Sequence, residues 1–333
     1  PYIETTRPLV VVTAPGPGSG KLATCLSQLY HEGRRGQPAG YAKFETFPIW
    51  NLPLKHPVNM AYEAATANLN DVNMIDPFHL EAYGETTVNY NRDIEVFPVV
   101  RAILSRTVGE EDLYKSPTDM GVNVAGYCIT DDTVVRASAR QEIIRRLYQA
   151  RKDYKLGRMA SDAVKKIEMI MSQLLISAED RPVIVAALDK KKAKNAPSAA
   201  IQLPDGHIVT GRETSLMNAP ASTIINAIKH LAGISDSLHL ISPVVLEPII
   251  KLKQVNLGAR SLILSLKEVL ICLSICAPTN PMVEHAMEQL PNLRGCEAHA
   301  TYIMPDGDED TVRKLGINLT CEPEFPGKDL YYE

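Results

Sequence analysis

A glycine-rich turn followed by a lysine is the stretch of this sequence best suited to bind an anion. Residues 14–20 read APGPGSG, and Lys21 follows them. Glycines let backbone N–H groups approach a phosphate, a helix N-terminus adds partial positive charge, and a lysine ammonium adds a full one. The phosphate-binding residues predicted here are Gly16, Gly18, Ser19, Gly20 and Lys21.

The turn departs at two positions from the nucleotide-binding pattern G-x-x-x-x-G-K-[ST]. Pro15 stands at the first glycine position, and Leu22 replaces the hydroxyl residue that usually binds Mg²⁺. A tight strand-to-helix turn with a solvated lysine is the alternative. Three glycines and the lysine favour an anion site, and if that anion is a nucleotide, the expected cofactor is ATP or another nucleotide with Mg²⁺.

Four side chains in the N-terminal part have the chemistry of acids, bases or metal ligands. They are His56, Asp76, His79 and Asp119. Open α/β sheets place their ligands in loops after strands, and Asp76 ends the short apolar stretch 72–75. We predict that these four residues form the catalytic centre, either as acid and base groups or as metal ligands. Each histidine taken alone is more often a hydrogen-bonded structural residue.

The C-terminal half contains a weaker candidate for a metal site. Cys272, Cys276 and Cys296 with His299 have the residue types of a Cys₃His zinc site. The first two cysteines lie in the apolar run 270–277, where free cysteine packs as a small hydrophobe. Core packing is therefore the preferred interpretation. The sequence has neither H-E-x-x-H nor G-x-S-x-G.

These residues need a scaffold of alternating strands and helices. The apolar run Leu9–Val12 predicts a buried strand before the glycine turn, and helical spacing of apolar residues follows Lys21. Stretches 41–47 and 72–75 predict further strands, and stretch 90–108 predicts a helix. Residues 1–132 are therefore predicted to be a P-loop-like α/β domain, whose strand–turn–helix opens a mainly parallel sheet.

The rest of the chain divides into two further parts. Three charged helical stretches predict a helical connector over residues 133–195. Residues 196–333 predict a second, smaller α/β domain, with a hairpin around Pro204-Asp205-Gly206 and two late strands that bracket a helix.

Composition narrows the class of protein. The 333 residues carry a net charge of −4 without a basic block, so nucleic acid is not an expected partner. No apolar run reaches membrane-spanning length, so no membrane association is expected. Six cysteines dispersed over so long a chain are typical of reduced thiols, and no signal peptide precedes the first predicted strand, so we expect a cytoplasmic protein.

Several long strings together resemble one bacterial family, the domain of unknown function 1846 proteins. They include TRPLVVVTAPGPGSGK, KFETFPIWNLPLKHPVN, DVNMIDPFHLEAYG, VNYNRDIEVFP, SPTDMGVN, ARQEIIRR, CEAHATYI and LGINLTCEP. The resemblance covers nearly the whole chain. It implies an α/β fold and a phosphate site, without an established reaction. It also implies a further N-terminal α/β region upstream of TRPL, which this sequence lacks.

The function expected from the sequence is therefore an enzyme that binds a nucleotide or another phosphorylated small molecule. A metal-dependent hydrolase that uses His and Asp or Glu residues is one alternative. A non-catalytic phosphate-sensing or assembly protein is the other. A homo-oligomer is compatible with each of these.

Overall fold

The computed structural model describes residues 2–16, 18–44, 47–108, 113–121, 123–259 and 261–326. Residue contacts divide the chain into two units, 1–140 and 141–333. Both units combine helices with a small sheet, so the predicted mixed α/β class is confirmed. Within the described ranges, none of the helices combines the length and the apolar composition that crossing a membrane requires.

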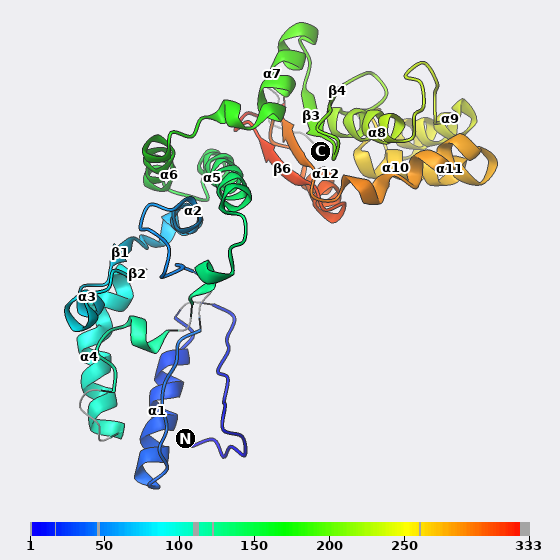
Figure 1. Cartoon of the computed structure of the whole chain (residues 1–333). Coiled ribbons are helices and arrows are strands. Elements are labelled where there is room, and N and C mark those ends of the chain that lie inside the picture. The colour runs from blue at the N-terminus through cyan, green and yellow to red at the C-terminus, as the bar shows by residue number, and fades with distance from the viewer. Residues whose placement is uncertain are drawn as a thin grey trace. The chain divides into compact units, whose positions relative to one another are not determined.

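Unit 1 is mainly helical (Figure 1). Its elements are α1 (Lys21–Arg34), α2 (Pro57–Ala65), η1 (Ala67–Leu69), β1 (Asn73–Ile75), α3 (Pro77–Tyr83), β2 (Val88–Tyr90), α4 (Asn91–Val108), η2 (Thr118–Met120), η3 (Ala125–Cys128) and the first part of α5 (Asp132–Lys155). Helices α1 and α4 lie side by side. Leu29 of α1 and Phe97 of α4 are buried in the core between them.

The predicted strand over Leu9–Val12 and the mainly parallel sheet are not confirmed. Leu9 is 79% exposed and Val11 is 76% exposed, and no described residue pairs with this segment in a ladder. The sheet of unit 1 consists of β1 and β2, which are antiparallel and place Ile75 opposite Val88. Branched apolar residues favour a strand, but a strand also needs a neighbour to pair with and pack against. The helix that follows the glycine turn and the short strand before Asp76 are confirmed.

Part of the predicted strand over 41–47 makes only a local contact. Lys43 forms an isolated parallel bridge with Gly121, and residues 45 and 46 lie outside the described ranges. The proline-rich segment after it packs into the unit. Trp50 is buried, and its ring lies so close to Gly121 that a Cβ there would be 1.4 Å from a ring carbon. The side chain of Asn59 both accepts from and donates to the backbone of Ile49, at 2.8 Å and 3.0 Å, which fixes this segment on α2.

Unit 2 contains a larger sheet and more helices. Besides the second part of α5, its elements are α6 (Ser161–Leu174), η4 (Ala178–Asp180), α7 (Pro182–Lys194), β3 (Ser198–Gln202), β4 (Ile208–Arg212), α8 (Ala219–Leu231), α9 (Pro243–Lys251), the π-helix η5 (Leu252–Asn256), α10 (Leu266–Cys276), η6 (Ala277–Thr279), α11 (Pro281–Met287), η7 (Leu290–Leu293), β5 (Glu297–Ala300), α12 (Asp306–Lys314) and β6 (Asn318–Cys321). The charged helices expected between 133 and 195 are present as α5, α6 and α7, whereas the three-part domain division stays a prediction.

The sheet of unit 2 has the strand order β4-β3-β5-β6. Strands β3 and β4 form the predicted hairpin, and β3 is also antiparallel to β5. Strands β5 and β6 are parallel and are joined through α12, as the two late strands around a helix predicted. The predicted hairpin and the two late strands around a helix are thus confirmed, whereas a separate C-terminal α/β domain over 196–333 stays a prediction.

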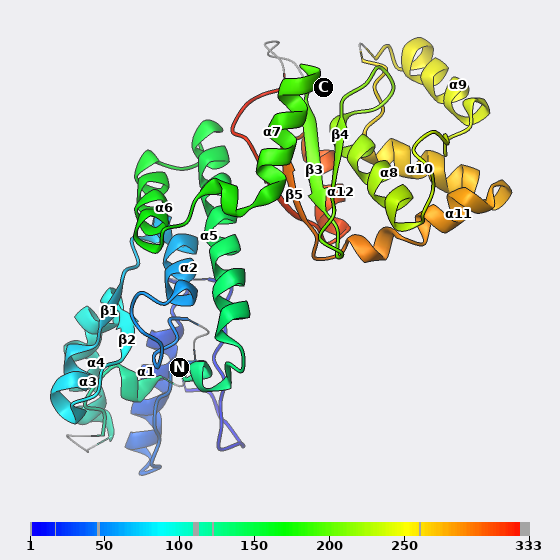
Figure 2. The ribbon, with the colours of Figure 1, turned by 45° about the horizontal axis from the view of Figure 1, so that its top comes forward.

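Helices cover both faces of this sheet (Figure 2). Ala200 of β3 packs against Val183 and Ala187 of α7, whereas the next residue, Ile201, lies in the large core with α8 and α10. Successive side chains of a strand point to opposite faces, so β3 serves two cores. Helix α8 lies directly on β4, because a Cβ at Gly211 would be 2.3 Å from the backbone nitrogen of Thr223.

Candidate functional site

The glycine turn closes on its own lysine. The Nζ atom of Lys21 donates a 3.0 Å hydrogen bond to the carbonyl oxygen of Gly16, and Ser19 Oγ donates to the same oxygen. Gly18 and Gly20 have φ of 73° and 87°, a left-handed conformation that glycine adopts without strain. Gly20 is the N-cap of α1 and has no side chain to accept from the first-turn N–H groups. The unsatisfied N–H groups, which carry partial positive charge, and the Lys21 ammonium are therefore the groups of the turn that can attract an anion.

Asp76 is a fully buried N-cap that connects two segments. Its Oδ1 accepts from the backbone nitrogens of Phe78 and His79, at 3.0 Å and 3.1 Å, and thereby caps α3. Its Oδ2 accepts from Oγ1 and the backbone nitrogen of Thr118, at 2.6 Å and 3.2 Å. The carboxylate is 0% exposed and accepts four hydrogen bonds, so its visible role is to hold α3 against η2.

This connection brings His79 to Asp119. The Nδ1 atom of His79 lies 2.9 Å from Oγ of Ser116 and 3.7 Å from Oδ1 of Asp119. The imidazole is 12% exposed, and its Nε2 faces Glu85 Oε2 at 4.0 Å. Its inner nitrogen is thus held by protein groups, whereas its outer nitrogen is beyond hydrogen-bond distance of the nearest carboxylate. An imidazole held in this way can exchange a hydrogen bond or a proton with a ligand.

Asp119 is held by three donors through its other oxygen. Oδ2 accepts from the backbone nitrogens of Lys115 and Ser116, at 2.8 Å and 3.1 Å, and from the hydroxyl of Tyr83 at 3.1 Å. The Tyr83 ring also lies 4.6 Å from the His79 ring. Burial and then the hydrogen bond to Asp119 raise the pKa of Tyr83 above its usual 10.0, so its hydroxyl keeps its proton through neutral pH.

The structure therefore adds Ser116 and Tyr83 to the residues that sequence reasoning proposed. Ser116 could have been found, because S-P-T-D has the spacing of a capping box. In the structure, Ser116 Oγ accepts from the Asp119 nitrogen at 3.2 Å, and Asp119 accepts in return. Tyr83 had no such local signal, because its partner lies 36 residues away.

Among the described residues, the side chain of His56 forms its hydrogen bonds with Val58 and Asp132 and not with the residues around His79. It is the N-cap of α2, where Nδ1 accepts from the Val58 nitrogen at 3.3 Å, and its Nε2 lies 2.8 Å from Oδ1 of Asp132. Hydrogen bonds from Arg136 and then from His56 lower the pKa of Asp132. Because the side chain is 2% exposed and both ring nitrogens have partners, His56 connects the start of α2 to the start of α5.

The glycine turn and the His79 cluster are anchored in one hydrophobic core. Leu22 follows Lys21, Phe78 precedes His79, and Met120 follows Asp119. All three side chains pack in the cluster built around Leu29 and Phe97. The first turn of α1, the first turn of α3 and the end of η2 are therefore fixed to the same core.

Neither the His79 cluster nor the cysteines form a recognisable metal centre. In the part of the chain that the structure describes, no group of three or more His, Cys, Asp or Glu is arranged to hold a metal ion. Cys272, Cys276 and Cys296 are buried among apolar residues in the large core of unit 2.

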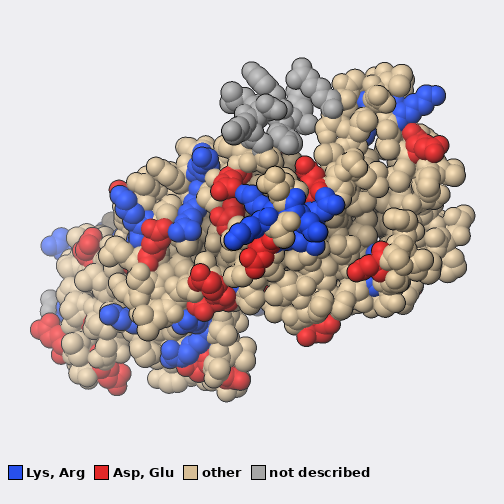
Figure 3. Space-filling model, turned by 90° about the horizontal axis from the view of Figure 1, so that it is seen from above, with Lys and Arg blue, Asp and Glu red and all other residues tan. Residues whose placement is uncertain are grey.

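Figure 3 shows that basic and acidic side chains are intermixed on the face that it draws.

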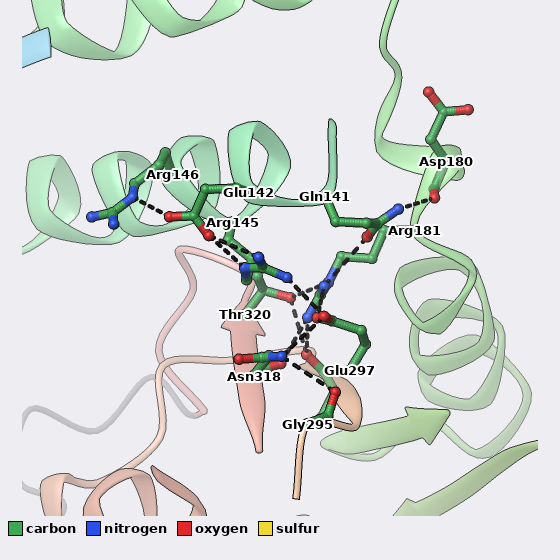
Figure 4. Close-up of polar contacts among 11 residues, drawn as sticks. Gln141, Glu142, Arg145, Arg146, Asp180, Arg181, Gly295, Glu297, Asn318 and Thr320 are labelled. Carbon is green, nitrogen blue, oxygen red and sulfur yellow. Dashed lines mark hydrogen bonds and ion pairs between the residues drawn. The ribbon is translucent and has the colours of Figure 1, made fainter. Parts of the chain in front are cut away.

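A second polar cluster, in unit 2, was not foreseen from the sequence. The guanidinium of Arg181 is fully buried and donates to Thr320 Oγ1 at 3.1 Å, to the carbonyl oxygens of Ala298 and Asn318 at 3.0 Å and 2.8 Å, and to Glu297 (Figure 4). Its Nη1 also lies 3.5 Å from Gln141 Oε1. Every N–H of the guanidinium thus has a partner, so this cluster joins α7 to β5 and β6 and offers no open position for a ligand.

Comparison with known proteins assigns the chain to a family. Residues 1–175 match "Domain of unknown function DUF1846, N-terminal", and residues 179–331 match the corresponding C-terminal domain. A UPF0371 protein of Clostridium tetani is 56% identical over 340 residues, which cover 100% of this chain and 68% of the relative. UPF0371 proteins of Clostridioides difficile strain 630 and Clostridium botulinum strain Langeland are 56% and 55% identical and are also covered over 68% of their length. The chain belongs to the DUF1846 family and carries its N-terminal and C-terminal domains in that order.

Proposed function

We propose that unit 1 binds a phosphorylated small molecule, with nucleotides among the candidates, and acts on it as an enzyme. The observation that carries this proposal is one hydrophobic core, which contains Met120 and against which Leu22 and Phe78 pack. These three residues adjoin Asp119, Lys21 and His79 in the chain. A positively charged turn and a partly exposed imidazole, both fixed to the same core, are groups that can bind a phosphate and donate a hydrogen bond to it.

Each group has a role that follows from its contacts. The backbone N–H groups of residues 18–21 bind the phosphate, and Lys21 leaves the Gly16 carbonyl oxygen to neutralise it. His79 faces the ligand through Nε2, and Ser116 Oγ lies 2.9 Å from Nδ1 on the inner side of the ring. Asp76 and His56, whose polar atoms already have partners within the protein, position α3 and α2.

The test is calorimetry of the full chain with inorganic phosphate, pyrophosphate and ATP. We expect at least one of them to bind the wild type at millimolar concentration or below. Lys21→Ala should weaken this binding about tenfold or more, because a hydrogen bond to a charged group contributes about 1.5–3 kcal/mol. Lys165→Ala is the matched control, since that lysine is 69% exposed on α6 and, among the described residues, pairs with Asp162 alone at 3.5 Å.

Three outcomes would contradict the proposal or its enzymatic part. If none of the three probes binds the wild type at millimolar concentration, the anion site is wrong. If Lys21→Ala and Lys165→Ala bind equally well, phosphate binds elsewhere. Binding without any turnover, in wild type and His79→Gln alike, would replace the enzyme with a phosphate-sensing protein.

A further inference from the structure

The hydroxyl of Ser116 determines which nitrogen of His79 carries the proton. Ser116 is 0% exposed, and its Oγ has two neighbours. The backbone N–H of Asp119 donates to Oγ at 3.2 Å, and Nδ1 of His79 lies 2.9 Å away. A backbone N–H can only donate, so the Ser116 hydroxyl accepts from Asp119, and its own O–H still needs an acceptor.

Among the described residues, His79 Nδ1 is the acceptor available to that hydrogen. A buried hydroxyl without an acceptor is strongly disfavoured, so Ser116 donates to Nδ1. When Nδ1 accepts, a neutral imidazole carries its hydrogen on Nε2. The outer nitrogen of His79, the one that faces away from Ser116 and Asp119, is then an N–H donor.

We propose that Ser116 holds neutral His79 as the Nε2–H tautomer, so that His79 binds an anionic oxygen of the ligand as a hydrogen-bond donor. This inference rests on the proposed function for the class of ligand, a phosphorylated small molecule. It assigns Ser116 as a positioning residue. It also separates His79 from two other roles, because a general base or a metal ligand at Nε2 needs a free lone pair on that atom.

The experiment is a long-range proton–nitrogen correlation spectrum of the full chain labelled with ¹⁵N-histidine, recorded about two pH units above the ordinary histidine pKa of about 6.5. His79→Gln assigns the peaks of His79. We expect His79 in the Nε2–H form. Ser116→Thr should retain the His79 signature, because it keeps the hydroxyl.

Ser116→Ala should move the tautomer ratio of His79 several-fold toward Nδ1–H, because the remaining neighbour of Nδ1 is the Asp119 carboxylate, which can only accept. Ser172→Ala on α6 is the control that should change nothing. An Nδ1–H signature for wild-type His79, or an unchanged ratio in folded Ser116→Ala, would overturn the inference. The wild-type spectrum decides the first of these even if Ser116→Ala does not fold.

Titration with inorganic phosphate, pyrophosphate and ATP in the same spectra distinguishes this inference from the proposed function. Movement of the His79 Nε2 resonance in wild type, and a several-fold smaller movement in Ser116→Ala, would support the donor role. An Nε2–H signature that none of the three probes shifts would contradict the proposed function and the donor role together, and would leave the assignment of the tautomer to Ser116 intact.

Discussion

Thr118 donates a 2.6 Å hydrogen bond from Oγ1 to Oδ2 of Asp76 and so joins η2 to the start of α3. Both residues are buried. His79 follows Asp76 by three residues, and Asp119 directly follows Thr118. The distance between the proposed imidazole and carboxylate therefore depends on this contact.

Asp76→Ala should destabilise unit 1 by about 2 kcal/mol or more, because it removes a helix cap and leaves buried donors without an acceptor. Urea unfolding measures this change. Asp162→Ala is the control, since that carboxylate is in the first turn of α6 and 89% exposed, and it should change stability by less than about 0.5 kcal/mol. Equal effects of the two substitutions would show that Asp76 does not hold the segments together.

Arg181→Ala should destabilise unit 2 by about 3–5 kcal/mol, because it breaks the buried ion pair with Glu297. Glu297 would then keep its ion pair with Arg145 but lose the one with Arg181. Arg181→Lys should recover little, since an ammonium cannot replace the five fixed donors of a guanidinium. The control is Arg146→Ala, which removes a surface pair with Glu142 and should cost about 0.5 kcal/mol or less. Thermal unfolding of the three variants decides between a buried connection and an incidental contact.

Unit 2 should lose stability as the pH falls below about 6.5, through His299. Burial lowers the pKa of this histidine below 6.5 in the folded protein, so the unfolded chain takes up the proton at a higher pH. The stabilisation from neutral His299 is complete above the pKa that this histidine has in the unfolded chain. It is lost as the pH falls toward and through the pKa in the folded protein, and the free energy of unfolding then decreases by at most about 1.4 kcal/mol per pH unit. The groups around the ring are Thr320, Tyr148 at 5.1 Å and Glu322, whose Oε1 lies 3.3 Å from Nε2.

The measurement is the free energy of unfolding between pH 5 and pH 8 for wild type and His299→Phe, with the pH range chosen around the ordinary histidine pKa of about 6.5. His299→Phe keeps the ring contact with Tyr148 and should flatten the profile. His285→Gln, at a side chain that is 55% exposed, should leave it unchanged. A wild-type profile that persists in His299→Phe would assign the acid sensitivity to another group.

Two glycines should respond to alanine with opposite signs. At Gly211 a Cβ would lie 2.3 Å from the Thr223 backbone, so Gly211→Ala should force α8 away from β4 and cost about 1–3 kcal/mol. At Gly307, within α12, no heavy atom lies within 4 Å of the added Cβ, so Gly307→Ala should stabilise the protein by about 0.5–1 kcal/mol. Chemical denaturation of both variants measures the difference, and a Gly211→Ala variant as stable as the wild type would contradict the close packing of α8 on β4.

The sequence predicts the features of this chain that depend on local signals. The hairpin at Pro204-Asp205-Gly206 and the helix after Lys21 need only turn residues and apolar spacing, and both are present. The run Leu9–Val12 has the composition of a strand, but pairing depends on a neighbour that composition does not specify. Local sequence signals thus predict single helices and hairpins more reliably than they predict which strands pair in a sheet.

The candidate site shows the same limit. His79 and Asp119 were proposed from their residue types, but their partners come from contacts between distant segments. Ser116 lies 37 residues from His79 along the chain, and Arg181 reaches Glu297 over 116 residues. Spacing along one sequence carries no information on such pairs, because the packing of separate helices and strands decides them.

The double engagement of Ser116 has a consequence for how this protein can evolve. One hydroxyl both accepts from the first turn of η2 and faces the imidazole, so the fold and the proposed ligand contact would depend on the same atom. Under the proposed function, a substitution that removes this hydroxyl would change the imidazole and loosen the turn together. Glu85 is 77% exposed and borders the ring outside these buried contacts, so it is a neighbour that can vary, whereas Tyr83 donates to Asp119.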